Sequence, residues 1–178
     1  PARNFHEALQ AYWFTLLIDY IFQNGSAISC GRFDQFLYPY YRADLDSGVL
    51  TRDEAQEFVE ALWVKHNDII KACTYNSARN NGGFSTSAHL TVGGMTPEGS
   101  DACNDLTFLC LEADRNVFNC EPNIGVRVCR SNPLTLPKKV FDILSEVGGG
   151  KYPIFNDEVI IDALVRDGMP LKEARDYA

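Results

Sequence analysis

The cysteines of this chain are its most reactive side chains, and their spacing decides which cysteine chemistry is open to them. The six are Cys30, Cys73, Cys103, Cys110, Cys120 and Cys129. No two are separated by only two residues, as in zinc ribbons, which predicts no metal site and disfavours a thiolate metal-binding protein. Cys103 and Cys110 lie seven residues apart and share one face of a predicted helix. We interpret all six as reduced thiols that pack as small apolar side chains.

Three histidines and one aspartate are the other candidates for chemistry. His6, His66 and His89 are scattered, and Asp19 stands in an apolar helical stretch. His89 lies on a predicted strand beside a candidate loop, where it could line a pocket, whereas we interpret His66 as structural or exposed. A carboxylate in apolar surroundings needs a partner, so we expect Asp19 to pair with an arginine. No motif of serine hydrolases, zinc proteases or phosphate-binding loops is present, so these residues do not identify a reaction by themselves.

The charge and hydropathy of the chain exclude two classes of partner. Its 16 basic and 24 acidic residues give a net charge of −8, and the basic residues form no cluster, which argues against a nucleic-acid partner. The longest apolar run, residues 12–18, is too short to cross a membrane. No signal peptide is recognisable, so we expect a protein of the cytoplasm.

Strands and helices alternate along most of the chain, and this order predicts the scaffold that must position the candidate residues. The pattern predicts strands at residues 27–30, 89–92, 123–129 and 152–155, and helices at 5–22, 34–45, 51–71, 101–116, 137–147, 156–166 and from 170. Such alternation is typical of an α/β fold with parallel strands joined by right-handed crossover helices. The first helix is so rich in apolar residues that we expect it to be largely buried. Residues 75–86 are expected to form a polar loop.

Loops at the strand ends are where parallel α/β folds carry their chemistry. The candidate loops are residues 24–32, 82–88, 93–100, 128–133 and 155–157. Within residues 31–35 we expect an ion pair between Arg32 and Asp34 to fix a strand-to-helix turn. Four strands cannot close a barrel and leave sheet edges open, so we expect a marginally stable piece of something larger.

Seven longer strings are far more specific than any short motif, and they cover essentially the whole chain. They are PARNFHEALQAYWF at 1–14, GRFDQFLYPYY at 31–41, LTVGG at 90–94, CLEA at 110–113, PNIGVR at 122–127, IFNDE at 154–158 and ARDYA at 174–178. In this order and spacing they resemble the glycyl radical enzyme family, of the pyruvate formate-lyase and polyol dehydratase type.

The resemblance implies a ten-stranded α/β barrel made of two half-barrels, of which residues 1–178 are an incomplete internal piece of the catalytic barrel domain. It implies a lyase of anaerobic metabolism that acts on a small-molecule substrate. A glycine near the family's C-terminus stores a radical, which a radical S-adenosylmethionine activating enzyme installs. A cysteine on a central loop becomes a thiyl radical and takes a hydrogen atom from the substrate, after which a C–C or C–heteroatom bond breaks or forms. It also implies a homodimer of the full-length protein in an anaerobic cytoplasm.

The family's catalytic residues have no counterpart in this sequence. In the family, a string similar to residues 176–178 comes just before the catalytic Gly-Cys-x-Glu loop, and none of the six cysteines here matches the catalytic one by context. We therefore assign no catalytic residue to this chain. A non-catalytic scaffold or pseudoenzyme fragment of the same fold is the alternative.

Three small residues stand at positions that the resemblance places in the substrate pocket. Polyol dehydratases carry Asn-Gly-His-Ser where this chain has Asn24, Gly25, Ser26 and Ala27, and a tyrosine where it has Ser87. The resemblance thus makes Ser26, Ala27 and Ser87 the candidate substrate-binding residues. Because the hydroxyl-binding side chains are absent and the walls are small, we expect a bulkier substrate and C–C chemistry, with polyol dehydration disfavoured.

Overall fold

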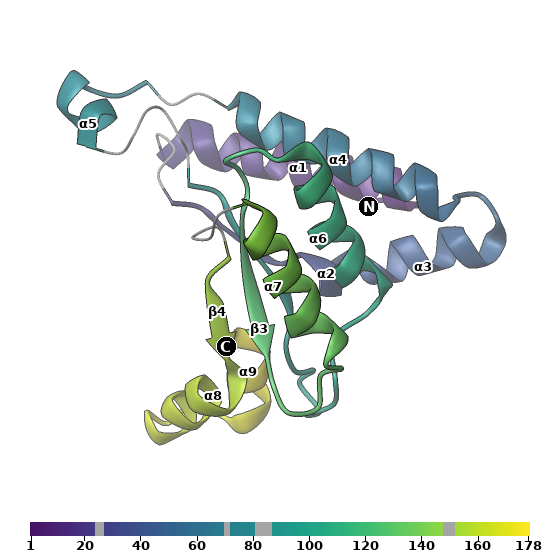
Figure 1. The fold of residues 1–178 in the computed structure, drawn as a ribbon, viewed down its shortest axis with the longest axis vertical. Helices are drawn as coiled ribbons and strands as arrows, with labels where there is room; N and C mark the ends of the chain where they lie inside the picture. Colours follow the sequence, from purple (N-terminus) through teal and green to yellow (C-terminus); the bar gives the residue numbers. More distant parts are fainter. Residues whose placement is uncertain (24–26, 70–71, 81–86, 148–151) are drawn as a thin grey trace.

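The computed structural model describes residues 1–23, 27–69, 72–80, 87–147 and 152–178, and these form a helix-covered sheet of four parallel strands (Figure 1). The strands lie in chain order and are β1 (Ser29–Arg32), β2 (His89–Gly93), β3 (Asn123–Val128) and β4 (Ile154–Asn156). The predicted α/β class and the parallel pairing are confirmed. β-branched residues favour the strand conformation of β3. The helices that connect successive strands allow the strands to run parallel.

The helices follow the predicted pattern, except that the predicted helix 34–45 is divided in two, the one predicted from 101 begins at Asp105, and one helix is added. They are α1 (Phe5–Gln23), α2 (Phe33–Phe36), α3 (Tyr38–Ser47), α4 (Arg52–Asp68), α5 (Tyr75–Asn80), α6 (Asp105–Val117), α7 (Thr135–Val147), α8 (Asp157–Arg166) and α9 (Leu171–Tyr177). Thr51 and Glu54 form a reciprocal capping box at the start of α4. The short helix α5 lies where a loop was predicted, and the Thr74 hydroxyl accepts a hydrogen bond from the Ser77 N–H at its start.

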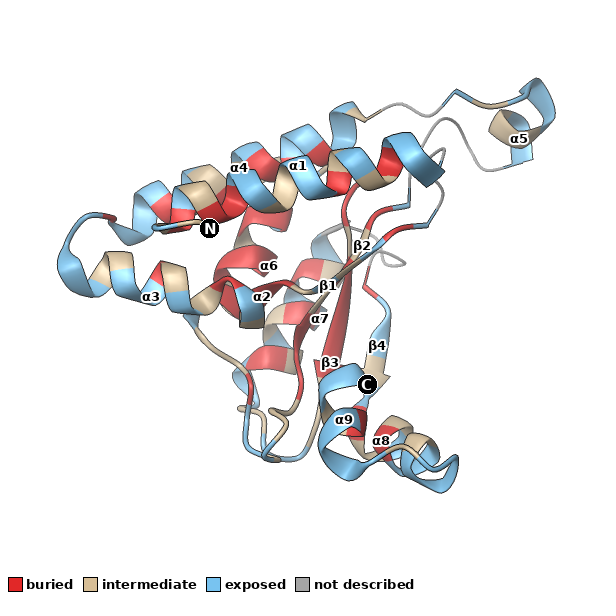
Figure 2. Ribbon diagram, turned by 180° about the vertical axis from the view of Figure 1, so that it is seen from behind, coloured by how far each residue is buried: buried red, intermediate tan, exposed pale blue. Residues whose placement is uncertain are grey.

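One face of the sheet makes the hydrophobic core. Leu90 and Val92 of β2 and Ile124 and Val126 of β3 are buried, and they belong to one cluster with residues of α6 and α7. Residues at alternate positions of a strand point to opposite faces, so the residues between these four lie on the second face. In Figure 2 the strands β1 and β2 run in front of α6 and α7, so that view looks toward the second face.

A buried ion pair ties the carboxyl ends of the strands to α8 and α9. Arg127 of β3 and Asp157 of α8 are fully buried, and Arg127 donates two hydrogen bonds to the carboxylate, of 2.8 and 2.9 Å. Its Nη2 also donates to the carbonyl of Arg175 at 2.7 Å. Arg127 thereby fixes α9 against the end of the sheet.

The expected ion pair between Arg32 and Asp34 is wrong. Arg32 instead pairs with Asp176 at 3.1 Å and donates to the carbonyls of Gly93 and Met95. Asp34 is buried and accepts hydrogen bonds from the side chains of Gln35 and Thr107 and from the Gly93 N–H. Both side chains therefore join distant segments rather than fixing their own turn.

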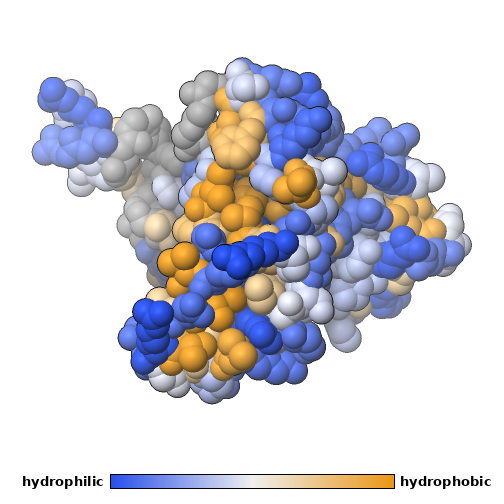
Figure 3. Space-filling view, turned by 60° about the horizontal axis from the view of Figure 1, so that its bottom comes forward, coloured by the Kyte–Doolittle hydropathy of each residue, from blue (hydrophilic) through white to orange (hydrophobic). Residues whose placement is uncertain are grey.

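The first helix is more exposed than its apolar composition predicted. Phe14, Ile18, Ile21 and Phe22 are all more than half exposed, because α1 packs on α3 and α4 with one side only. Further apolar surface appears where α8 and α9 close the lower end of the molecule (Figure 3). Exposed apolar areas of this kind are typical of surfaces that another part of a protein covers.

Candidate functional site

The second face of the sheet gathers polar and aromatic side chains along β2, β3 and β4. His89 and Thr91 of β2, Asn123 of β3 and Phe155 of β4 are half buried there, while Gly125 of β3 is buried. Thr91 pairs with Gly125 and His89 pairs with Asn123 in the parallel register. These five residues form what we call the open face. Hydrogen-bonding groups beside a ring on a sheet are typical of a small-molecule site.

Two rings of the open face meet over Gly125. The imidazole of His89 and the ring of Phe155 lie edge to face, with centroids 6.1 Å apart at 79°. A Cβ atom at Gly125 would lie 2.6 Å from Nε2 of His89 and 2.9 Å from Cε2 of Phe155. Only a glycine leaves room for both rings to lie this close to the strand. Burial lowers the pKa of His89, so its imidazole is neutral at neutral pH and offers one donor and one acceptor.

The amino edge of the sheet adjoins this face and holds two of the three predicted site residues. Ala27 and Ser87 each lie two residues before the paired residues Ser29 and His89, so the parallel strands place them side by side. Both are exposed, and both have a left-handed backbone with φ of 55°. They stand at the amino ends of β1 and β2, opposite the edge where most candidate loops lie. Ser26 lies outside the described residues.

A buried carboxylate, which the sequence alone did not single out, supports this edge. Glu121 is 4% exposed, and its Oε1 accepts a hydrogen bond of 2.9 Å from the Ser87 N–H. Its Oε2 accepts one of 3.4 Å from the Asn123 side chain. Glu121 thus couples the loop before β2 to the start of β3. In the sequence, only its position just before the Pro-Asn-Ile-Gly string could have indicated that Glu121 belongs to the site.

The carboxyl edge of the sheet is occupied by contacts within the chain. The Asn132 side chain donates to the carbonyl of Gly94 at 2.7 Å and to Asp101 at 2.6 Å. The Cys129 thiol lies 3.0 Å from the Ser131 hydroxyl. We interpret the loops at this edge as structural supports.

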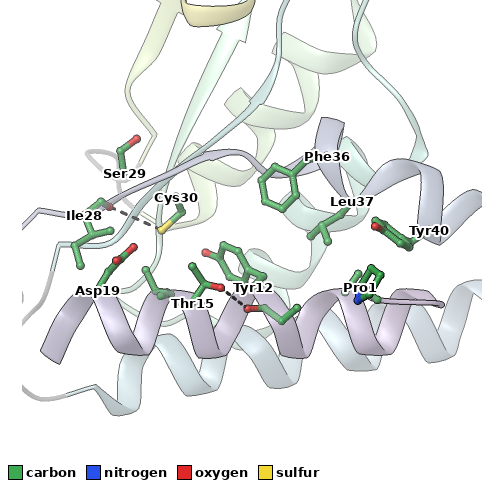
Figure 4. A pocket seen from close by; sticks show the side chains of 14 residues that line it. Pro1, Tyr12, Thr15, Asp19, Ile28, Ser29, Cys30, Phe36, Leu37 and Tyr40 are labelled. Atoms are coloured by element: carbon green, nitrogen blue, oxygen red, sulfur yellow. Dashed lines mark hydrogen bonds between the residues drawn. The ribbon is translucent and has the colours of Figure 1, made fainter. Parts of the chain in front are cut away.

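A cleft of about 510 Å³ lies between α1 and β1 (Figure 4). Two of its polar side chains are bonded within the chain, since Tyr12 contacts the buried His66 at 3.1 Å and Thr15 donates to the Ala11 carbonyl. Burial raises the pKa of the Cys30 thiol to about 11 and lowers that of His66 to about 4, so neither is charged at neutral pH. Asp19 lines this cleft, and no ion pair with an arginine is found for it among the described residues. Tyr12, Thr15 and Cys30 of the cleft are therefore engaged or uncharged, and we place the candidate site on the open face.

Other site types find no support in the described part of the chain. All six cysteines are free thiols. Among the described residues, no cluster of histidine, cysteine and carboxylate side chains could hold a metal ion. No helix within the described ranges has the length and hydropathy needed to cross a membrane.

Comparison with known proteins identifies the relatives of this chain. The profile of the pyruvate formate lyase-like family matches residues 1–178. The isethionate sulfite-lyase of Nitratidesulfovibrio vulgaris is 37% identical over 182 residues, which cover 100% of this chain and 22% of that protein. A solved structure concerning 1,2-propanediol dehydration in Roseburia inulinivorans is 42% identical with a TM-score of 0.93, and covers 99% of this chain and 22% of its own. The glycerol-bound B12-independent glycerol dehydratase of Clostridium butyricum is 39% identical with a TM-score of 0.89, and covers 98% and 22%. The chain thus spans about a fifth of the length of its relatives.

The expectation that polyol dehydration is disfavoured is wrong. Two of these similar structures are described by the dehydration of 1,2-propanediol and of glycerol. Ser26, Ala27 and Ser87 lack the hydroxyl-binding side chains of polyol dehydratases, which is why polyols were not expected. Small residues at three positions do not by themselves remove hydrogen-bonding capacity, and His89 and Asn123 have donors and acceptors on the adjoining strands.

Proposed function

Because the chain belongs to the pyruvate formate lyase-like family of glycyl radical enzymes, we propose that its parent protein is a lyase that eliminates a leaving group from a small hydroxylated substrate. The names of the relatives support this class, since isethionate, 1,2-propanediol and glycerol all carry a hydroxyl group next to the carbon that bears a second polar group. In this chain, the positions of His89 and Asn123 on the open face support the proposal, because both side chains can form a hydrogen bond with a hydroxyl group.

We propose that the radical glycine and the catalytic cysteine lie in parts of the parent protein outside this chain. Bound substrate would lose a hydrogen atom to the thiyl radical, and the departure of the neighbouring group would follow. A radical S-adenosylmethionine enzyme would install the glycyl radical, and the full-length protein would act as a homodimer in an anaerobic cytoplasm.

The residues of this chain would bind and orient the substrate. The neutral imidazole of His89 would accept or donate a hydrogen bond at a substrate hydroxyl, and the Asn123 amide would do the same nearby. Ser26, Ala27 and Ser87 would line the amino edge of the pocket, where their small side chains leave space. Phe155 would exclude water from one side of the substrate, which strengthens these hydrogen bonds.

The full-length protein, activated anaerobically by its radical partner, provides the test. We expect elimination products from at least one of propane-1,2-diol, glycerol and isethionate, measured by mass spectrometry, and no product from the unactivated protein. A strong glycyl radical signal in electron paramagnetic resonance, with no elimination from any of the three, would contradict the proposal. Failure to form any radical with a competent activating enzyme would favour the non-catalytic alternative.

A further inference from the structure

We propose that Gly125 determines the size of the substrate by letting the rings of His89 and Phe155 lie against β3. This inference rests on the proposed function and names the residue that limits the substrate class. The two rings can lie close to the backbone of β3 at this point only because position 125 lacks a side chain. Any larger residue there would lift both rings toward the space in front of the sheet.

An alanine side chain at position 125 would meet the ring ends of two side chains. The atoms that an added Cβ would meet are Nε2 of His89, at 2.6 Å, and Cε2 of Phe155, at 2.9 Å. Both atoms belong to rings that can turn about their own side-chain bonds, so the strand need not move. Gly125 lies inside the continuous pairing of β2 and β3 and is not among the glycines with positive φ, so alanine fits its backbone.

The direction of the displacement follows from the layout of the sheet. Behind β3 the core side chains Ile124 and Val126 are fully buried against α6 and α7, so nothing can move that way. His89 and Phe155 are only half buried, which means that their free side is the space in front of the sheet. An alanine at position 125 would therefore reduce the volume available to a ligand there.

The expected effect is a change in discrimination rather than a loss of folding. One methylene group in a pocket changes relative specificity by about 10- to 200-fold. We expect Gly125→Ala to weaken the binding of butane-1,2-diol to the unactivated full-length protein at least about 10-fold more than that of propane-1,2-diol. Calorimetric titration measures both affinities without any turnover.

Two further variants make the experiment specific. Gly48→Ala, at an exposed turn with φ of +72° where an added Cβ meets nothing within 4 Å, is the control for a general loss of stability and should leave the ratio of the two affinities unchanged. Gly125→Ala combined with Phe155→Ala should restore part of the affinity for butane-1,2-diol. Removal of the Phe155 ring makes the space in front of β3 larger again.

A crystal structure of the Gly125→Ala protein gives a readout that does not depend on any substrate. We expect the His89 and Phe155 rings to be displaced away from β3 with the strand unmoved. Rings that keep their positions, or affinities for the two diols that fall by the same factor, would overturn the role of Gly125. Binding of diols with no elimination by the activated protein would instead count against the proposed function and leave this result standing.

Discussion

Replacing Asp157 with alanine should destabilise the protein by about 3–5 kcal/mol, enough to abolish most of its soluble yield. The change leaves Arg127 fully buried with its charge uncompensated, since the carboxylate accepts two of its hydrogen bonds. Arg127 would keep its bond to the carbonyl of Arg175 in α9, but its guanidinium would lose the carboxylate that orients it. The unfolding midpoint in urea and the soluble yield measure the loss.

An exposed ion pair provides the control for this prediction. Arg115 and Glu146 are joined at 2.7 Å, but their side chains are 42% and 49% exposed. Glu146→Ala should therefore cost only about 0–1 kcal/mol. Equal stability of the Asp157→Ala and Glu146→Ala proteins would show that the buried pair does not hold the carboxyl ends of the strands together.

Gly94→Ala should also be severely destabilising, for a different reason. Gly94 has a φ of +81°, and an added Cβ would lie 2.7 Å from both Cβ of Arg127 and Oδ2 of Asp157. The left-handed backbone costs an alanine about 1–2 kcal/mol, and the overlap adds about 1–3 kcal/mol because neither buried neighbour can give way. We expect a lowered midpoint of thermal unfolding and a poor yield.

Gly48→Ala separates the two costs. Gly48 has nearly the same φ, +72°, but no atom lies within 4 Å of its added Cβ. This variant should lose only the backbone cost of about 1–2 kcal/mol. If both glycine variants lose the same stability, the close packing of Gly94 against the ion pair contributes nothing.

Local signals in the sequence predicted the elements of the fold well. The Thr51–Glu54 capping box and the β-branched run of β3 depend on neighbours a few residues apart, and the structure contains both. The parallel order followed from the alternation of strands and helices. The exposure of Phe14 and Phe22 could not be predicted, because composition shows that a helix is apolar but not which of its sides is covered.

The site was harder to predict because its contacts join distant segments. Asp34 accepts from the Gly93 N–H, 59 residues away, and Glu121 accepts from the Ser87 N–H, 34 residues away. His89 was considered as a pocket residue, but the role of Gly125 depends on a register between strands that no local pattern contains. The expectation about polyols, which the similar structures contradict, considered Ser87 without the residues on the neighbouring strands.

An anaerobic crystal structure of the full-length protein with its substrate bound would test the central claim most directly. We predict that a substrate hydroxyl lies within about 3 Å of a His89 ring nitrogen and that the substrate rests over Gly125 and Phe155. A substrate bound in the cleft between α1 and β1, or anywhere that leaves His89 and Gly125 without contact, would contradict the assignment of the open face.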